Sequence, residues 1–195
     1  MAILGDSDSN TINGTAGADT VFANGGADTV AGLAGGDQLF GGDGNDILFG
    51  GNGNDILNGG GGVDQLYGGE GADILNGGTG NDILNGGEGN DVLIGGADRD
   101  VMNGGTGTDS FTYIASTDSK AGLATRDIIL DFTHGVDRID LHNLHLTAAD
   151  IDLSHNYGGD YAQLLRISSL HNGVFDMEIQ LNGTHGAVTL ADLYL

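Results

Sequence analysis

The sequence of 195 residues contains no cysteine, no proline and no tryptophan, and only five of its residues are lysine or arginine. Without cysteine there is no disulfide framework, so the redox compartment stays undecided. The net charge of -23 argues against nucleic acids and anionic membrane surfaces as partners, because both select basic residues. No apolar run approaches the roughly 18 residues of a membrane span, and residues 1–4 are too few for the apolar region of a cleaved signal peptide. These absences predict no membrane insertion and favour cations as partners.

Glycine, by contrast, accounts for 39 residues, about three times its usual share, and it recurs with a fixed spacing. From Gly5 to Thr112 the chain divides into twelve units of nine residues without insertion or deletion. The sixth position is aspartate in every unit except the first, where it is Asn10, and the eighth position is apolar in all twelve. A register kept over 108 residues favours a repeat architecture over a disordered acidic segment.

The most regular units, such as Gly41-Gly-Asp-Gly-Asn-Asp-Ile-Leu-Phe49, match the pattern GGxGxDxUx, in which U is an apolar residue. Over residues 5–112 the chain therefore resembles RTX proteins, whose nonapeptides form parallel β-rolls with bound Ca²⁺. The resemblance implies an all-β fold class, a parallel β-roll in the form of a two-sheet right-handed β-solenoid. We expect this roll over residues 1–112 and a β-rich C-terminal cap over residues 113–195.

The physical chemistry of a single unit predicts the same fold. Positions seven to nine can form a three-residue strand whose middle side chain points inward, so that two units make one coil and the eighth positions fill the space between two sheets. Glycine at positions one, two and four permits backbone angles that other residues avoid. Asparagine at position five tolerates left-handed conformations, which favours a turn over the first six positions; it occurs at Asn45, Asn54, Asn81 and Asn90.

The sixth positions predict two rows of carboxylates, one along each edge of the roll, because stacked coils are offset by 18 residues. Carboxylates one strand spacing apart repel each other unless a cation lies between them, and Ca²⁺ prefers the carboxylate and carbonyl oxygens of glycine-rich turns. Five gaps along each edge would hold up to about ten Ca²⁺ ions, whose charge would nearly cancel the net charge of -23. The predicted metal ligands are Asp19, Asp28, Asp37, Asp46, Asp55, Asp64, Asp73, Asp82, Asp91, Asp100 and Asp109, with Gly41, Gly44, Gly50, Gly53, Gly59, Gly62, Gly68, Gly71, Gly77, Gly80, Gly86 and Gly89.

These predicted sites are not equivalent. Asn10 lacks a charge, several early units depart from Gly-Gly at their first two positions, and the eleventh unit has Asp98 where glycine is usual. We therefore expect the tightest binding between Asp37 and Asp109. One inward apolar side chain in every nine residues makes a core too small to offset the conformational entropy of a glycine-rich chain. The array is thus expected to be largely unfolded without Ca²⁺.

Several apolar residues fall at positions seven and nine, which are predicted to point outward. Two interpretations remain open. They stabilise the strands at modest exposure, or they form a face that docks another module of a larger protein. These residues are Phe22, Phe40, Ile47, Phe49, Ile56, Tyr67, Ile74 and Ile83.

Beyond Thr112 the period ends, and the open end of the roll requires a cap. Phe111, Phe132 and the alternation of Ile128 with Leu130 are expected to form its apolar plug. The run Arg126-Asp-Ile-Ile-Leu-Asp-Phe-Thr-His-Gly-Val-Asp-Arg-Ile-Asp-Leu141 resembles the element that follows the repeats in serralysin-type proteases and in R-modules of mannuronan C5-epimerases. Later residues resemble the R-module more: Tyr157-Gly-Gly, Glu178-Ile-Gln-Leu-Asn-Gly183 and Val188-Thr-Leu-Ala-Asp192. Strands are predicted over residues 127–132, 138–141, 161–167, 175–181 and 187–195.

The chain is not expected to be an enzyme. The zinc-binding His-Glu-x-x-His helix of serralysins is missing, and the epimerases keep their catalysis in a separate module that is missing too. His142 and His145, with Asp140, are the one metal-like cluster of the segment, and a surface turn is the favoured interpretation. The sequence leaves open whether the cap also binds Ca²⁺, for instance at Asp118 or Asp127.

The final residues, Asp192-Leu-Tyr-Leu195, resemble the C-terminus of proteins exported by type I secretion, and an ordinary last strand would give the same pattern. Together with the repeats, they predict a secreted module that passes the type I machinery unfolded, folds on Ca²⁺ outside the cell, and serves a catalytic module as an R-module would. The alternative is a free-standing calcium-binding matrix or surface protein. Because basic residues are few, we expect only weak binding of an anionic polysaccharide such as alginate.

Overall fold

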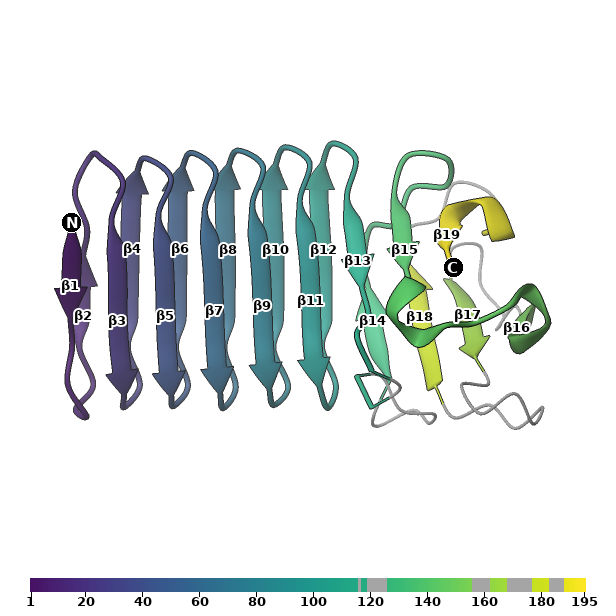
Figure 1. Ribbon diagram of the computed structural model, residues 1–195, viewed down its shortest axis with the longest axis horizontal. Helices are drawn as coiled ribbons and strands as arrows, with labels where there is room; N and C mark the ends of the chain where they lie inside the picture. The colour runs from purple at the N-terminus through teal and green to yellow at the C-terminus, as the bar shows by residue number, and fades with distance from the viewer. Residues whose placement is uncertain (116, 119–125, 156–161, 168–176, 183–187) are drawn as a thin grey trace.

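The computed structural model describes residues 1–115, 117–118, 126–155, 162–167, 177–182 and 188–195. These ranges contain 19 strands and three short 3-10 helices. All of these strands belong to two sheets, which lie one behind the other along an elongated roll (Figure 1). The predicted all-β fold, a parallel β-roll of two sheets with a β-rich cap, is confirmed.

The odd-numbered strands other than β17 form a nine-stranded parallel sheet in the order β1-β3-β5-β7-β9-β11-β13-β15-β19. Its members are β1 (Ala2–Leu4), β3 (Thr20–Gly25), β5 (Gln38–Asp43), β7 (Ile56–Gly61), β9 (Ile74–Thr79), β11 (Val92–Ala97), β13 (Ser110–Thr112), β15 (Arg138–Asp140) and β19 (Leu193–Tyr194).

The second sheet has ten strands in the order β16-β17-β18-β14-β12-β10-β8-β6-β4-β2. It comprises β2 (Thr11–Asn13), β4 (Thr29–Ala34), β6 (Ile47–Asn52), β8 (Gln65–Glu70), β10 (Ile83–Glu88), β12 (Val101–Thr106), β14 (Asp127–Ile129), β16 (Ile151–His155), β17 (Ala162–Ile167) and β18 (Met177–Asn182).

The register of the roll repeats every 18 residues. Leu48 of β6 lies opposite Leu66 of β8, and Leu57 of β7 lies opposite Leu75 of β9. Consecutive strands alternate between the two sheets. Two nonapeptides therefore make one coil, as predicted.

The strands are longer than predicted. Most of those in the roll have six residues, running from position seven of one unit to position three of the next, as in β6. Within β6, Leu48 and Gly50 are buried on the inner side, whereas Phe49 between them is exposed. The prediction of three-residue strands was wrong because glycine at position one was treated as part of a turn. In the structure it is an inward strand residue without a side chain.

Left-handed backbone occurs at positions two and four of the turns, and not at positions one or five. Gly42 and Gly44, for example, have φ angles of 109° and 141°. Asn24 and Asp98 adopt the same conformation without being glycine. Asparagine at position five serves another purpose, since its Oδ1 accepts a backbone N–H of the next coil, as from Val63 to Asn45 at 2.9 Å. The left-handed conformation predicted for these asparagines was therefore wrong.

The interior consists of the eighth positions, which are fully buried in eleven units and 9% exposed at Ile12. The same hydrophobic cluster continues into the cap, where the rings of Phe111 and Phe132 lie 6.3 Å apart. Ile129 is buried, whereas Leu130 is 44% exposed. The predicted plug was therefore wrong in its alternation, because Ile129 takes the inward position of β14.

The cap extends both sheets of the roll. β14 and β18 continue the ten-stranded sheet in parallel, and β17 and β16 follow in antiparallel orientation. The predicted strands correspond to β14, β15, β17, β18 and β19, whereas residues 161, 175–176 and 187 of those predictions and the Tyr157-Gly-Gly motif lie outside the described ranges. The 3-10 helices are η1 (His142–Leu144), η2 (Ala148–Asp150) and η3 (Leu190–Asp192). No helix in the described ranges has the length and apolar character needed to cross a membrane.

Candidate metal centre

The aspartates of position six form two buried rows along the edges of the roll. One row lies directly before the strands of the nine-stranded sheet, and the other lies before the strands of the ten-stranded sheet. No carboxylate in either row is more than 3% exposed. The first row contains Asp19, Asp37, Asp55, Asp73, Asp91 and Asp109, and the second contains Asp28, Asp46, Asp64, Asp82 and Asp100.

Each carboxylate is held by the coil before it. The backbone N–H of Asp46 donates to Oδ1 of Asp64, and the N–H of Asp64 donates to Oδ1 of Asp82, both at 2.8 Å. The same bond recurs along both rows at 2.7–3.0 Å. One oxygen of each carboxylate is thereby fixed, and the other is turned toward the gap between coils.

That second oxygen, Oδ2, is the unusual feature of the rows. It is buried and has no hydrogen-bond partner within the described part of the chain in nine aspartates. Buried polar atoms in proteins are almost always satisfied, and a buried charge without a partner is costly. The rows therefore require a ligand that neutralises them. The nine residues are Asp28, Asp37, Asp46, Asp55, Asp64, Asp73, Asp82, Asp91 and Asp100.

The pKa values of the row aspartates reflect the same cost of burying an unpaired charge. Burial raises the pKa of Asp64 and Asp73 to about 6, that of Asp82 to about 7 and that of Asp100 to about 8. The hydrogen bond to each carboxylate opposes this shift, and the charge of neighbouring carboxylates in the row adds to it. A positive ion between the coils would favour the ionised form instead.

The glycines of position one provide the space that the carboxylates need. A Cβ added to Gly59 would lie 2.3 Å from Oδ2 of Asp64 and 2.7 Å from the carbonyl oxygen of Gly77. These two oxygens therefore face one common space in front of Gly59. The other predicted glycines of this position have equivalent surroundings, with corresponding distances of 2.2–2.4 and 2.5–2.7 Å: Gly41, Gly50, Gly68, Gly77 and Gly86.

The glycines of position four bring carbonyl groups to the same edge. A Cβ on Gly62 would lie 1.7 Å from the carbonyl oxygen of Gly44 in the preceding coil. The equivalent distance is 1.6–1.9 Å at Gly44, Gly53, Gly71, Gly80 and Gly89. Carbonyl oxygens thus point from coil to coil, and carboxylate and carbonyl oxygens lie together along each edge. Such a donor set fits Ca²⁺, which takes six to eight carboxylate and carbonyl oxygens.

The beginning of the first row differs from its middle. Oδ2 of Asp19 accepts hydrogen bonds from the backbone N–H and the hydroxyl of Thr15, at 2.6 and 2.7 Å, and its Oδ1 lies 2.8 Å from the ammonium group of Met1. These contacts, the ammonium group first, lower the pKa of Asp19 to about 2. Asp19 is therefore already satisfied by the protein, unlike the nine aspartates described above.

Two further carboxylates stand at the cap ends of the rows. The sequence left Asp127 open as a Ca²⁺ ligand, and it did not indicate Asp137. Asp127 and Asp137 continue the rows, since their Oδ1 atoms accept the N–H groups of Asp100 and Asp109 at 2.8 and 3.0 Å. Asp127 is the first residue of β14 and Asp137 directly precedes β15, and in both cases the residue two positions later, Ile129 or Ile139, is buried. This Asp-x-apolar pattern, familiar from positions six to eight of the repeats, is the signal that would have found Asp137.

The histidine cluster of the cap lies at a short 3-10 turn. Nδ1 of His142 contacts Oδ1 of Asp140 at 2.5 Å, and His145 adopts a left-handed conformation at the end of η1. Across the described ranges, no group of three or more histidine, cysteine, aspartate or glutamate side chains could hold a metal. The surface turn favoured from the sequence agrees with this geometry. For the roll, the same result means that backbone carbonyls would supply part of any ligand set.

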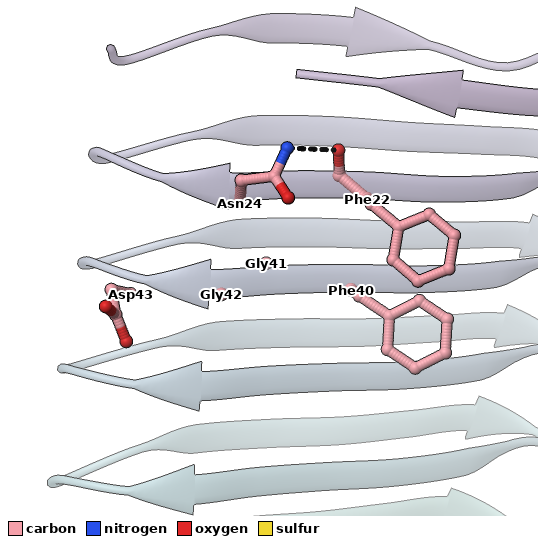
Figure 2. A pocket seen from close by; sticks show the side chains of 6 residues that line it. All are labelled: Phe22, Asn24, Phe40, Gly41, Gly42 and Asp43. Atoms are coloured by element: carbon pink, nitrogen blue, oxygen red, sulfur yellow. Dashed lines mark hydrogen bonds between the residues drawn. The ribbon is translucent and has the colours of Figure 1, made fainter. Parts of the chain in front are cut away.

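The outer faces carry paired aromatic rings. Phe22 and Phe40 stack on adjacent strands with centroids 4.9 Å apart (Figure 2), and Phe49 stacks on Tyr67 at 5.1 Å. A shallow groove of about 260 Å³ lies beside the first pair, lined also by Asn24 and by residues 41–43 (Figure 2). The predicted outward orientation holds: Phe22, Phe49, Ile56, Ile74 and Ile83 are exposed by 39–43%. Such cross-strand pairs stabilise a sheet. This fits the interpretation that the outward apolar residues stabilise the strands.

The repeats of this chain match a known protein family. The family model described as RTX calcium-binding nonapeptide repeat (4 copies) matches residues 4–39, 40–75 and 76–111. Among solved structures, the AlgE6R2 subunit of the Azotobacter vinelandii mannuronan C5-epimerase is 27% identical, covering 72% of this chain and 87% of its own, with a TM-score of 0.42. The AlgE6R3 subunit is 24% identical over 97% of this chain and 79% of its own, with a TM-score of 0.37. No curated protein matches the chain.

Proposed function

The chain belongs to the family of the RTX calcium-binding nonapeptide repeat, and from this membership we propose that it is a non-catalytic module of a secreted protein that folds by binding Ca²⁺ outside the cell. The observation that carries the proposal is the set of nine buried Oδ2 atoms without hydrogen-bond partners in the described ranges. A divalent cation between successive coils would neutralise two carboxylates at once. In this proposal the predicted aspartates supply the charge and the glycine-rich turns supply carbonyl oxygens.

Binding and folding are coupled in this proposal. The rows exist only when coils stack, because each carboxylate is oriented by a hydrogen bond from a residue 18 positions away. The unfolded chain therefore has no preformed site, and Ca²⁺ stabilises the folded state by mass action. A chain with a charge of -23 would remain extended where free Ca²⁺ is scarce. It would fold on reaching a medium with more Ca²⁺, which suits export through the type I machinery in an unfolded state.

The C-terminal residues are compatible with both interpretations of their sequence. Leu193 and Tyr194 form β19 and pair with β15, while Asp192 is buried and accepts the backbone N–H of Gly135 at 3.0 Å. In the folded protein they are thus an ordinary last strand. A type I export signal would act earlier, in the unfolded chain, where the same four residues are accessible.

A role as an accessory module follows from the same features. In this proposal the buried aspartate rows serve folding. Any contact with an anionic polysaccharide such as alginate would need bridging Ca²⁺, because the whole chain has only five lysine and arginine residues. We therefore propose weak polysaccharide binding at most, with a catalytic module as the partner.

A predicted tight Ca²⁺ site, at Asp64, can be compared directly with a predicted weak one, at Asp19. Asp64→Ala removes a carboxylate whose Oδ2 has no hydrogen-bond partner among the described residues, and it is expected to raise the Ca²⁺ midpoint of folding roughly tenfold. Asp19→Ala removes a carboxylate already satisfied by Thr15 and Met1, and less than about threefold is expected. Isothermal titration calorimetry and a circular dichroism titration measure both variants. Equal losses would show that the ranking of sites is wrong.

The raised pKa values predict how the metal-free fold responds to pH. Folded carboxyl groups with a pKa of about 6 to 8 bind protons that the unfolded chain, with a pKa near 3.9, releases. The metal-free fold is therefore stabilised as pH falls through 8 toward 4, and destabilised as pH rises. In chelator, more β signal is expected at pH 5.5 than at pH 7.5. Less β signal at pH 5.5 than at pH 7.5 would contradict the assignment of Asp64, Asp82 and Asp100 as buried in the apo fold.

A further inference from the structure

Seven asparagines of the roll are followed directly by glycine. Glycine has no side chain to obstruct its backbone nitrogen, and its backbone is freer than that of any other residue. This nitrogen can therefore attack the side-chain amide carbon of the asparagine before it, provided that it loses its proton and is not held in a hydrogen bond. Each such pair is a chemically labile point of the chain. The seven residues are Asn13, Asn24, Asn52, Asn58, Asn76, Asn85 and Asn103.

The fold holds such glycine nitrogens in hydrogen bonds between coils. The N–H of Gly14 donates to the carbonyl oxygen of Ala31, and the N–H of Gly53 donates to that of Glu70, both at 2.7 Å. The acceptor in each case is a backbone carbonyl of a neighbouring coil, as expected in a parallel ladder. A nitrogen held in this way neither loses its proton easily nor turns toward the asparagine amide. Stacking of the coils therefore protects these pairs.

The last pair, Asn103 and Gly104 of β12, is held differently. The N–H of Gly104 donates to Oδ1 of Asp131 at 3.0 Å, and the other oxygen of this carboxylate accepts the N–H of Gly105 at 2.7 Å. On the side of the cap, β14 pairs with β12 through two residue pairs, both before Asn103, whereas β10 on the other side pairs through five. Within the described ranges, a single side chain of the cap thus takes the place of the strand that would hold Gly104.

The carboxylate of Asp131 is suited to this task. Hydrogen bonds to an ionised acceptor are shorter and roughly twice as strong as neutral ones. The negative charge beside Gly104 also makes removal of the amide proton more costly, because removal would leave two negative charges side by side. Asn103 is only half-buried and Gly105 is exposed, so water reaches this part of β12. Without Asp131, the attacking nitrogen, the asparagine amide and water would all be in place.

We propose that Asn103 is a site of spontaneous deamidation and that Asp131 controls its rate by holding the N–H of Gly104. In the reaction, the nitrogen of Gly104 gives up its proton and forms a bond to Cγ of Asn103. The bond between Cγ and Nδ2 breaks, and the side-chain nitrogen leaves as ammonia. Water then opens the cyclic imide at one of its two carbonyl groups, which gives aspartate or isoaspartate. No reactant other than water is needed, and the modification is separate from the binding of Ca²⁺.

Isoaspartate at residue 103 would alter the last coil. It lengthens the backbone by a methylene group directly before Gly104, where a Cβ added to the glycine would already lie 2.4 Å from Oδ2 of Asp109. The space there does not admit a displaced backbone, so a modified chain is expected to lose the last coil and the docking of the cap. For the metal-free chain the inference rests on the proposed function, because an unfolded chain lacks the bond to Asp131 and would be modified at all of its Asn-Gly pairs.

The test follows Asn103 by peptide mass spectrometry after incubation of the full chain in saturating Ca²⁺. Trypsin, added afterwards in chelator, cleaves after Arg99 and Lys120, and Asn103 is the single asparagine of residues 100–120. The peptide therefore reports on Asn103 alone. Residues 1–99 contain the other six Asn-Gly pairs of the roll and serve as an internal reference.

Asp131→Ala is expected to accelerate the conversion of Asn103 roughly tenfold without changing the rate in residues 1–99. Asp131→Asn keeps an acceptor oxygen without the charge, and a smaller acceleration is expected. Asp192→Asn is the matched control, because it removes a buried carboxylate that holds Gly135 of the cap, and it is expected to leave the rate at Asn103 unchanged. Circular dichroism in Ca²⁺ verifies that each variant is folded.

An unchanged rate at Asn103 in both Asp131 variants would overturn this inference. An equal acceleration in Asp192→Asn would overturn it too, because the effect would then come from general loosening of the cap. The unmodified chain in chelator separates the inference from the proposed function, since it is expected to unfold and to convert the pairs of residues 1–99 together with Asn103. A chain that stays folded in chelator would overturn the proposed function, while the variants compared in Ca²⁺ would still decide the role of Asp131.

Discussion

Chelation of Ca²⁺ is expected to abolish most of the β structure of this chain, and titration with Ca²⁺ is expected to restore it cooperatively. The core contains one apolar side chain for each unit of nine residues, while ordering a glycine-rich backbone carries a high entropic cost. The carboxylates of each row are stacked one strand spacing apart, with nine buried Oδ2 atoms that have no partner in the described ranges. Without a cation, repulsion along the rows opposes the stacking of coils that the core favours only weakly.

Far-ultraviolet circular dichroism during a Ca²⁺ titration of chelator-stripped protein measures this effect. Mg²⁺ at equal ionic strength is the control, because Mg²⁺ demands octahedral geometry at 2.0–2.1 Å and gives up its water reluctantly. It is expected to leave the spectrum nearly unchanged. Hydrogen exchange adds a local measure, since the N–H groups of Asp46 and Asp64, bonded to the next carboxylate, should gain protection together. A chain fully folded in chelator would mean that the core suffices and that the aspartate rows need another explanation.

Gly59→Ala is expected to be the more damaging of two neighbouring substitutions of the same kind, the other being Gly61→Ala. The new methyl group at residue 59 would lie 2.3 Å from Oδ2 of Asp64 and 2.7 Å from the carbonyl oxygen of Gly77. Either the carboxylate or the next coil has to move, and both belong to the proposed ion site. We expect a loss of about 3 kcal/mol in the free energy of unfolding, or roughly 6–12 °C in the melting temperature, and a weaker Ca²⁺ midpoint.

Gly61→Ala is the matched control because it lies in the same strand, β7. Its methyl group would have Thr79 Oγ1 at 3.5 Å and Asp43 Oδ1 at 3.8 Å as its nearest neighbours, which is ordinary van der Waals contact. Since alanine also restricts the unfolded chain, a change within about 1 kcal/mol is expected, with a stabilising sign. Thermal unfolding in saturating Ca²⁺ compares the two variants. Similar losses at residues 59 and 61 would show that the space before Asp64 is not specifically required.

Much of the fold was predictable because the sequence is periodic. Identical units have identical surroundings when they stack, so the eighth position, represented by Leu48 and Leu66, had to be the interior, and the sixth position, represented by Asp64, had to form rows. The apolar residues of positions seven and nine were correctly predicted to face outward for the same reason, since side chains alternate along a strand. The two-unit coil and the 18-residue offset needed no further information.

The errors arose where one residue type serves several purposes. Gly50 and Gly51 look alike in the sequence, yet Gly50 lies inside a strand beside Asp55 while Gly51 has a left-handed φ of 113°. Asn45 was predicted to adopt a left-handed backbone conformation, whereas in the structure its side-chain Oδ1 accepts a hydrogen bond from the next coil. Ile128 and Ile129 are adjacent and chemically identical, and only the pairing of β14 with β12 shows which of them is buried.

The sequence by itself thus determined the periodic part of this protein, namely the coil, its interior and the two carboxylate rows, and it predicted Ca²⁺ as their ligand. Only the tertiary structure decided how the rows end. Asp127 and Asp137 join them at spacings of 27 and 28 residues, which the 18-residue offset of successive coils does not predict, because those distances depend on how β14 and β15 dock on the last coils. The structure also distinguishes Asp19 and Asp137, whose Oδ2 atoms accept backbone N–H groups, from Asp100, whose Oδ2 lacks a partner in the described ranges. The physical reason is that repetition specifies the surroundings of a residue only while its neighbours repeat, and at the ends of the roll they do not.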